Sequence, residues 1–319
     1  MIKLIDDRDL ARSLRSDVRT GLTSAPKQLP PKWFYDSRGS ELFEEITRLP
    51  EYYPTRTERA ILTLRAPEIA RITEAKTLVE LGSGSSEKTR LLLDAMLTHG
   101  TLGSFVPLDV SEAALESAVD ALNLAYPGLS VSGVIGDFVR HLGHLPDGDN
   151  RVVAFLGGTI GNLEPAERAS FLTGLRAVLH EGEWLLLGAD LVKDPAVLVP
   201  AYDDAAGVTA DFNRNVLRVI NRELAADFDP AAFEHVALWD SDREWIEMRL
   251  RSRAGQRVHI RELDLIVDFE EGEELRTEVS AKFRRDGLAT ELARAGFELR
   301  HWWTDPHNWF GVALARVAG

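Results

Sequence analysis

Apolar and polar positions in the middle of the chain follow two alternating periods. Short apolar runs predict buried strands, and after most of them apolar residues recur every three or four positions, as in an amphipathic helix. One such helix begins at the N-cap residue Ser111 and places Leu115 and Val119 on one face. This alternation predicts a parallel sheet with helices on both faces. The expected strands are 77–82, 104–109, 129–135, 151–156 and 183–190, and the expected helices are 86–98, 111–125 and 165–180.

The C-terminal part of the chain has a different pattern. Residues 297–303 and 309–317 predict two strands joined by a Thr-Asp-Pro-His-Asn turn, and a helix precedes them over about 289–295. If this antiparallel hairpin joins the parallel sheet, the residues between the two parts are an insertion. We therefore expect an α/β fold with two domains: residues 60–195 with 285–319, and residues 1–59 with 196–284.

The turn after the first strand carries the most specific chemistry. Glu80 ends the strand, and Gly82 and Gly84 supply the first two glycines of a nucleotide-binding turn that opens a helix. Glu87 stands where the third glycine of a dinucleotide motif would be. This pattern favours S-adenosylmethionine over NAD, because its methionyl ammonium pairs with a carboxylate and it has no pyrophosphate. The alternative is an ordinary strand-to-helix turn.

Three further strand ends carry residues suited to a nucleoside. Asp109 can accept both hydroxyls of a ribose, or it can simply precede the Ser111 cap. Asp137 and Phe138 can bind the amino group of adenine and cover its ring, or they can be a loop acid beside a core aromatic. Residues 155–162 hold three glycines, which let backbone approach a ligand closely. Their coincidence at one edge of the sheet favours a nucleoside site.

Outside the sheet, three patterns have both a structural and a functional interpretation. Aromatic residues crowd 33–35 and 52–53, where they can form core or face a cationic ligand. Residues 275–283 alternate as a strand that places Glu278 and Ser280 on one face, either to hold a polar ring or to meet solvent. Thr55 with Glu58 predicts a capping box at the start of a helix.

Composition limits the function classes. The net charge is −14 and the pI is about 5.1, without a basic run of the kind that binds nucleic acid, so we expect no nucleic-acid partner. The chain has no cysteine, which excludes disulfides and thiolate chemistry. We expect no metal site, no signal peptide and no membrane span, and hence a cytoplasmic protein. His141 and His144 lie in a polar loop and are expected to be solvated.

Several blocks of the chain together form a recognisable set, namely residues 30–58, 79–90, 136–138, 155–162, 190–194, 201–215, 246–248 and 277–283. In these blocks the chain resembles the L-histidine Nα-methyltransferases of ergothioneine biosynthesis. The resemblance runs from about residue 13 to the end. It implies a class I, Rossmann-like methyltransferase domain with an inserted substrate lobe. It also implies trimethylation of the α-amino group of free histidine by S-adenosylmethionine, which gives hercynine. We expect the protein to be a monomer.

The resemblance assigns roles residue by residue. The donor-binding residues would be Tyr35, Gly82, Lys88, Asp109, Asp137 and Phe138. The histidine-binding residues would be Tyr52, Gly157, Asn162, Tyr202, Glu278 and Ser280, with Met248 lining the ring pocket. Tyr35, near the transferring methyl group, and Asn162 would be the catalytic residues. The chain departs from the family at Gly158 and Ala281, where the family often has Ser and Cys.

Three alternatives to a histidine methyltransferase stay open. A related enzyme could methylate another amino acid or small amine. An NAD-dependent oxidoreductase is disfavoured by Glu80 and the missing third glycine. A non-catalytic nucleoside-binding module is disfavoured because every residue expected of the active family is present.

Overall fold

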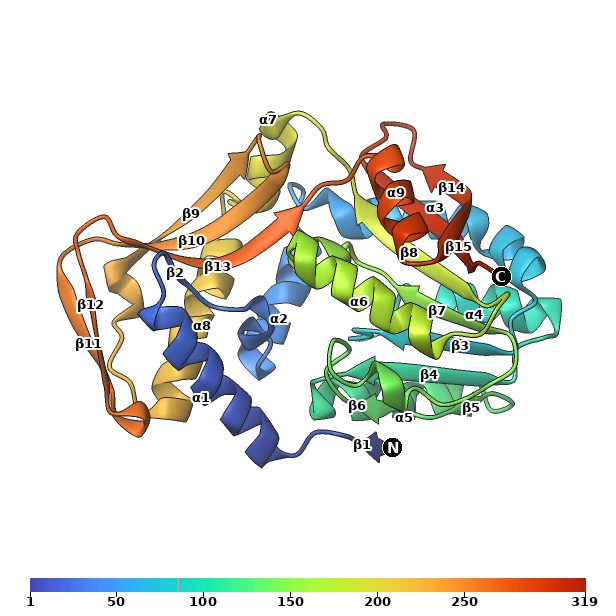
Figure 1. The fold of residues 1–319 in the computed structure, drawn as a ribbon, viewed down its shortest axis with the longest axis horizontal. Helices are drawn as coiled ribbons and strands as arrows, with labels where there is room; N and C mark the ends of the chain where they lie inside the picture. Colours follow the sequence, from blue (N-terminus) through green and yellow to red (C-terminus); the bar gives the residue numbers. More distant parts are fainter. Residues whose placement is uncertain (85) are drawn as a thin grey trace. The chain divides into compact units, whose positions relative to one another are not determined.

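The computed structural model describes residues 1–84 and 86–319. Contacts divide the chain into two compact units (Figure 1). Unit 1 comprises residues 1–5, 54–192 and 282–319, and unit 2 comprises residues 6–53 and 193–281. Both units are therefore assembled from segments that are distant in the sequence.

The first residues of the chain belong to unit 1, not to the lobe in which they were expected. Ile2 N donates to Gly133 O (2.8 Å) and Leu4 N donates to Ile135 O (2.9 Å), so that β1 (Ile2–Lys3) extends the sheet of unit 1. The assignment of residues 1–5 to the second lobe was wrong, because a two-residue strand carries no periodic pattern. The expected break at residue 60 also falls inside a helix, α3 (Tyr53–Thr73).

The sheet of unit 1 has the strand order β1-β6-β4-β3-β7-β8-β15-β14. Strands β3 to β8 on this path are parallel, whereas β15 is antiparallel to β8 and to β14, as the terminal hairpin predicted. The bounds are β3 (Thr77–Leu81), β4 (Ser104–Asp109), β5 (Ser130–Val131), β6 (Val134–Ile135), β7 (Arg151–Phe155), β8 (Trp184–Asp190), β14 (Phe297–Thr304) and β15 (Phe310–Val317). The expected strand 129–135 is split into β5 and β6, and the split lies opposite Pro107 of β4, which has no backbone N–H to contribute.

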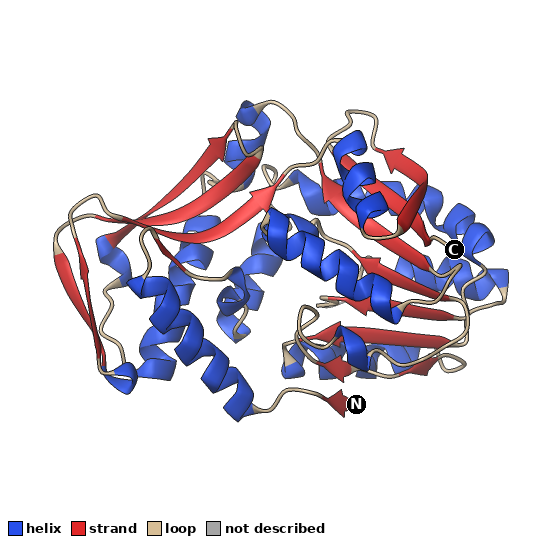
Figure 2. Ribbon diagram, in the orientation of Figure 1, coloured by secondary structure: helices blue, strands red, loops and turns tan. Residues whose placement is uncertain are grey.

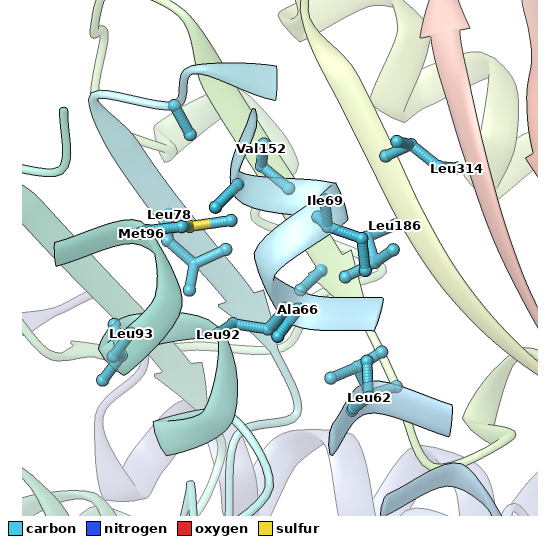
Figure 3. Packing of buried hydrophobic residues seen from close by; sticks show 14 of the residues in the cluster. Leu62, Ala66, Ile69, Leu78, Leu92, Leu93, Met96, Val152, Leu186 and Leu314 are labelled. Carbon is cyan, nitrogen blue, oxygen red and sulfur yellow. The ribbon is translucent and has the colours of Figure 1, made fainter. Parts of the chain in front are cut away.

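Helices cover both faces of this sheet (Figure 2). On one face, residues from α3 and α4 pack against the central strands and form a buried apolar cluster (Figure 3). On the other face, the ring of Phe171 in α6 packs against the ring of Phe155 in β7, with centroids 4.9 Å apart and the planes tilted by 43°. Both faces of the central strands are thus covered, which explains why every residue of β3 and β7 is buried. The helices are α4 (Arg90–His99), α5 (Glu112–Ala125), α6 (Pro165–Val178) and α9 (Arg285–Arg294), with short 3-10 turns at Leu142–His144 and Thr159–Asn162.

The chain leaves unit 1 after β8 and re-enters it at Lys282, and these two connections are bonded to each other. Phe283 N donates to Asp190 O (2.8 Å), and Val192 N donates to Phe283 O (3.1 Å). The buried side chains of Lys282 and Asp190 form an ion pair at 2.9 Å. Both ends of the segment 193–281 are therefore fastened to each other within unit 1.

Unit 2 is built on a sheet in the order β2-β13-β10-β9, against which α8 packs. Asn213, Phe212 and Val216 on the buried side of α8 lie against the sheet and α2. The helices are α1 (Asp7–Thr23), α2 (Ser37–Ile46), α7 (Pro195–Leu198) and α8 (Val208–Leu224), with 3-10 turns at Pro31–Phe34, Val199–Ala201, Pro230–Ala232 and Arg261–Leu263. The strands are β2 (Lys27–Gln28), β9 (Phe233–Asp240), β10 (Trp245–Ser252), β13 (Glu274–Ala281) and a separate hairpin of β11 (Gln256–Ile260) and β12 (Leu265–Phe269).

Candidate active site

The turn that follows β3 contacts the ends of the neighbouring strands. Gly82 and Gly84 have left-handed backbones, with φ of +67° and +49°, which favour glycine. Gly84 N donates to Asp109 Oδ2 (2.8 Å), and Gly82 N donates to Leu108 O (2.8 Å). The Phe138 ring lies 3.8 Å from the point where a Cβ on Gly82 would stand. The fold thus brings Gly82, Asp109 and Phe138 together at the carboxyl edge of the sheet.

Asp109 precedes the Ser111 cap, as one of its two interpretations predicted, and it also contacts the glycine turn. Its binding of a ribose stays a prediction. Its Oδ1 accepts from Ser111 N (3.0 Å), beside the Ser111 side chain that caps α5 through Ala114 N. Its Oδ2 accepts from Gly84 N, so the carboxylate fixes both the cap and the glycine turn. Burial raises the pKa of Asp109, and these backbone N–H groups oppose the rise. An ionised carboxylate has about four lone-pair sites in all, so such a group can accept bonds from several donors at once.

Glu80, the acid before the glycine turn, is buried and held by two hydroxyl groups. Ser86 Oγ donates to one carboxylate oxygen (2.9 Å) and Thr89 Oγ1 donates to the other. Burial raises the pKa of Glu80 to about 7, although both hydroxyls and Lys88 lower it. Ser86 adopts φ +52° in making this contact, so α4 begins at Arg90 and not at residue 86 as expected. The result is a buried carboxyl group that a nearby cation would ionise.

Glu58 was expected to cap a helix with Thr55, and that interpretation is wrong. Helix α3 already begins at Tyr53, and the Glu58 carboxylate is fully buried. Both of its oxygens accept from Gly157 N, at 2.9 and 3.0 Å, and one of them pairs with the Lys88 ammonium. Sequence reasoning missed this contact because the partners lie 30 and 99 positions away in the chain.

The turn after β7 presents Asn162 through two left-handed glycines. Gly157 and Gly158 have φ of +80° and +73°, and Gly161 N donates to Gly158 O (2.9 Å) as the 3-10 turn closes. A serine at position 158, which the resembled family often has, would be strained in this conformation. Gly158 therefore relieves backbone strain three residues after the end of the strand, and Asn162 ends the turn half-buried.

Asp137 and Phe138 form the loop after β6. The Phe138 ring packs on Phe155 at 5.0 Å and on Phe171 at 6.0 Å, and the Asp137 carboxylate accepts from Val139 N (2.8 Å). The expectation that His141 is solvated was wrong. Its ring is half-buried, and its Nδ1 lies 3.1 Å from Asp137 N and 3.2 Å from Asp137 O. His141 thereby fixes the backbone that carries the acid and the aromatic ring.

In unit 2, an aromatic row leads to a buried hydroxyl pair. Ring centroids lie 5.6 Å apart for Tyr35 and Phe43, 6.1 Å for Phe43 and Tyr52, and 6.4 Å for Tyr52 and Tyr202. The Tyr202 hydroxyl lies 2.8 Å from Ser280 Oγ, and both residues are buried. Ser280 is therefore not part of a solvated strand face, which was the structural alternative for this strand.

Glu278 and Met248 lie directly opposite each other in the pairing of β13 with β10. Directly opposed residues point to the same face of a sheet, so Met248, Glu278 and Ser280 share one face. Met248 is buried and Glu278 is half-buried. The fold thus gathers five of the expected histidine-binding residues in unit 2, namely Tyr52, Tyr202, Met248, Glu278 and Ser280.

A buried polar network supports this face of the sheet. His235 Nε2 lies 2.7 Å from Tyr202 O, and its Nδ1 lies 2.8 Å from Asn213 Nδ2. Thr277 Oγ1 donates to Asn213 Oδ1 (2.6 Å), next to Glu278 in the strand. Burial lowers the pKa of His235, which keeps the ring neutral so that it can accept as well as donate. No spacing motif in the sequence indicates this network.

The expected site residues fall into two groups that follow the units. Unit 1 holds Gly82, Lys88, Asp109, Asp137, Phe138, Gly157 and Asn162, and unit 2 holds the five residues above with Tyr35. Tyr35, expected near the donor, is 38% exposed within the aromatic row of unit 2. Their roles in binding stay predictions.

Among residues 1–84 and 86–319, no group of His, Cys, Asp and Glu side chains has the arrangement of a metal site. No helix within those residues is long and apolar enough to cross a membrane.

The parallel sheet, its terminal antiparallel hairpin and the glycine turn between Glu80 and Asp109 define a class I methyltransferase. The sequence profile of one family, described as "Histidine-specific methyltransferase, SAM-dependent", matches residues 14–317. The chain belongs to this family.

Relatives of this chain carry consistent names. It is 61% identical over 305 residues to a histidine N-alpha-methyltransferase of Mycolicibacterium smegmatis, covering 96% of this chain and 95% of the relative. It is 57% identical over 303 residues to a histidine N-alpha-methyltransferase of Mycobacterium tuberculosis, covering 95% and 94%. An ergothioneine biosynthesis protein 1 of Neurospora crassa is 32% identical over 297 residues, which are 85% of this chain and 33% of that protein.

Proposed function

We propose that this chain transfers three methyl groups from S-adenosylmethionine to the α-amino group of free L-histidine, giving hercynine for ergothioneine biosynthesis. The observation that carries the proposal is the match to the histidine-specific family over residues 14–317. The residues expected of that family are present in both units, and the class of substrate is a small molecule. The donor supplies an electrophilic methyl group on a sulfonium sulfur.

The residues of unit 1 fit the donor in type and geometry. Asp109, which accepts from Gly84 N and Ser111 N, would also accept from a ribose diol, and the Gly82–Gly84 turn presents no side chain at its two glycines. Asp137 and Phe138 would take the adenine, and Lys88 would take the donor's carboxylate. Glu80, buried and close to neutral, would ionise opposite the donor's ammonium group.

The residues of unit 2 would recognise histidine. The imidazole would lie against Met248, with Glu278 and Ser280 as hydrogen-bond partners and Tyr52 beside them. The hydrogen bond between the Ser280 and Tyr202 hydroxyls supports this role, because it orders a buried hydroxyl group that the imidazole of the substrate could use. Tyr202 and Asn162, with Gly157, would hold the amino-acid end of the substrate, and Tyr35 would lie near the transferring methyl group.

Positioning accounts for most of the proposed catalysis. Methyl transfer to nitrogen needs a neutral amine in line with the methyl carbon, and an ordered active site lowers the entropic cost of that arrangement. Asn162 would orient the amine through its side-chain amide. The amine loses one proton before each transfer. The carboxylates of the site would stabilise the positive charge that develops on the nitrogen as the methyl group is transferred.

Mass spectrometry of the products is the direct test. The protein is incubated with S-adenosylmethionine and an equimolar panel of free amino acids. We expect mass gains of one, two and three methyl groups on histidine only. A gain on a different amino acid would support the alternative of a related N-methyltransferase, and no gain on any would refute the proposal.

We also propose that the protein works as a monomer in the cytoplasm and binds neither nucleic acid nor membranes. Its net charge of −14 supports the absence of nucleic-acid binding. Light scattering after gel filtration should give about 35.5 kDa, the mass of one chain. A mass of two chains would refute the monomer.

A further inference from the structure

Glu58 is a fully buried carboxylate in unit 1 with no role in the proposed chemistry so far. It comes from α3, its cationic partner Lys88 follows β3, and its backbone partner Gly157 follows β7. Three elements that are separate in the sequence therefore meet at this one carboxylate. Burying a charge is costly unless it is paired and hydrogen-bonded, and Glu58 has both kinds of partner.

The sheet is shaped to admit this carboxylate. Gly188 of β8 lies against Glu58, and a Cβ at position 188 would overlap Glu58 Oε1. Only glycine at position 188 leaves the space that the carboxylate fills. The side chain is thus a built-in part of unit 1 and not a surface acid that happens to be covered.

The contacts of Glu58 reach both halves of the proposed site in unit 1. On one side, its charge fixes the Lys88 ammonium, whose side chain is 22% exposed and therefore accessible to a ligand. On the other side, it holds the N–H of Gly157, the first residue of the turn that ends in Asn162. The Lys88 ammonium also lies 3.6 Å from the point where a Cβ on Gly157 would stand, so cation and turn are adjacent.

We infer that Glu58 is a positioning residue that couples the donor site to the amine site, by holding Lys88 and the Gly157–Asn162 turn with one carboxylate. This inference rests on the proposed function. A donor carboxylate that attracts the Lys88 ammonium would weaken its pairing with Glu58, and Glu58 could then accept more strongly from Gly157 N. Conversely, a turn that is already ordered would favour the position of Lys88 that the donor needs. Occupation of either site should therefore strengthen binding at the other.

The effect of the Glu58 charge on Glu80 gives a measurement that would not change if Glu58 had only a structural role. Lys88 lowers the pKa of buried Glu80, whereas the charge of Glu58 raises it. Without the Glu58 charge, Lys88 acts on Glu80 unopposed, and Glu80 ionises at lower pH. The pH dependence of donor binding should therefore shift downward in a variant that lacks this charge.

The test uses Glu58→Gln, which keeps an oxygen for Gly157 N but removes the charge. Binding of S-adenosylhomocysteine is measured by calorimetry with and without saturating histidine, at pH 6 and pH 8. We expect at least tenfold weaker binding, a smaller gain in affinity from histidine, and a flatter pH dependence than in the wild type. The matched control is Glu68→Gln, on the same helix in an exposed pair with Arg65, which should change none of these.

A second variant covers the case in which Glu58→Gln does not fold. Glu58→Gln combined with Lys88→Met removes both charges, which leaves no unpaired buried ion. If Glu58 acts through Lys88, the double variant should bind the donor about as well as Lys88→Met alone, a comparison that does not need the single Glu58→Gln variant. A further tenfold loss on adding Glu58→Gln to Lys88→Met would overturn the coupling through Lys88.

The outcomes separate this inference from the proposed function. A variant with a lower melting temperature but wild-type affinity, histidine effect and pH dependence would make Glu58 a structural residue only, and the inference would fail. If the wild type binds S-adenosylhomocysteine but does not methylate histidine, the proposed function fails, while the donor affinity and pH dependence of Glu58→Gln still test the link to Lys88.

Discussion

The buried carboxyl of Glu80 should make donor binding depend on pH. Its pKa is raised by burial to about 7, so in the free protein the group is mostly protonated at pH 6 and mostly ionised at pH 8. A bound donor with a positively charged ammonium group favours the ionised form. Binding should therefore release a proton, and donor affinity should rise with pH through this window and then level off.

The magnitude follows from the ionised fraction. With a pKa of about 7, roughly one tenth of Glu80 is ionised at pH 6 and about nine tenths at pH 8. If only the ionised form binds well, affinity for S-adenosylhomocysteine should rise about tenfold between these pH values, or ~1.4 kcal/mol. Calorimetry in two buffers with different heats of ionisation counts the released proton.

The variant Glu80→Gln isolates this effect. Its affinity should be weak and nearly constant from pH 6 to pH 8, and it should release no proton on binding. Glu87→Gln, an exposed acid in the same turn, is the matched control and should keep the wild-type dependence. Equal wild-type affinity at pH 6 and pH 8, or a tenfold rise that persists in Glu80→Gln, would refute the assignment.

The same shift has a consequence for stability, with a fixed sign. Because the pKa in the folded protein lies above the ordinary value of 4.5, Glu80 contributes full stability below pH 4.5, and this contribution is lost as pH rises through about 7. The loss is roughly 3 kcal/mol at most, from 1.36 kcal/mol per pKa unit. In the absence of donor, Glu80→Gln should therefore melt higher than the wild type at pH 8 but not at pH 4.5.

Three further predictions test other parts of the molecule. Glu278→Ala should raise the KM for histidine roughly 10- to 100-fold with little change in the KM for the donor, because it removes one charged hydrogen bond of about 1.5–3 kcal/mol; equal effects on both would place Glu278 elsewhere. Asp109→Ala should weaken S-adenosylhomocysteine binding at least tenfold in calorimetry, and retained affinity would exclude Asp109 as the ribose ligand. Arg151→Met breaks a buried ion pair of 2.8 Å with Glu183 and should cost roughly 3–5 kcal/mol in urea unfolding at unchanged donor affinity of the folded protein.

The sheet was predictable because its signal is local. Continuous apolar strands and helix caps such as Ser111 lie within a few residues of what they specify, and the observed strands and helices of unit 1 mostly match their expected ranges within two or three positions. The exceptions have non-local causes. Ser86 leaves the helical conformation to bond Glu80, and the split of β5 from β6 lies opposite Pro107 in another strand.

The candidate site was predictable only in part, for the same reason. Strand-end residues such as Asp109 could be placed together because parallel topology brings strand ends to one edge. Glu58 could not, since the pattern Thr-x-x-Glu describes a cap equally well and its real partners are far away in the chain. His235 gave no signal either, because a buried histidine satisfied by Tyr202 and Asn213 has no spacing motif.

The ion pair between Asp190 and Lys282, with the backbone bonds beside it, has an evolutionary consequence. The stretch 193–281 starts and finishes at one point, where backbone bonds from Val192 and Phe283 and a buried ion pair hold the two crossings as neighbours. Such an arrangement lets the inserted stretch grow, shrink or be exchanged while β8 and β15 keep their register. Enzymes that share this nucleoside-binding sheet can in this way change their methyl acceptor by changing the inserted segment. The residues that bind the methyl donor then stay as they are.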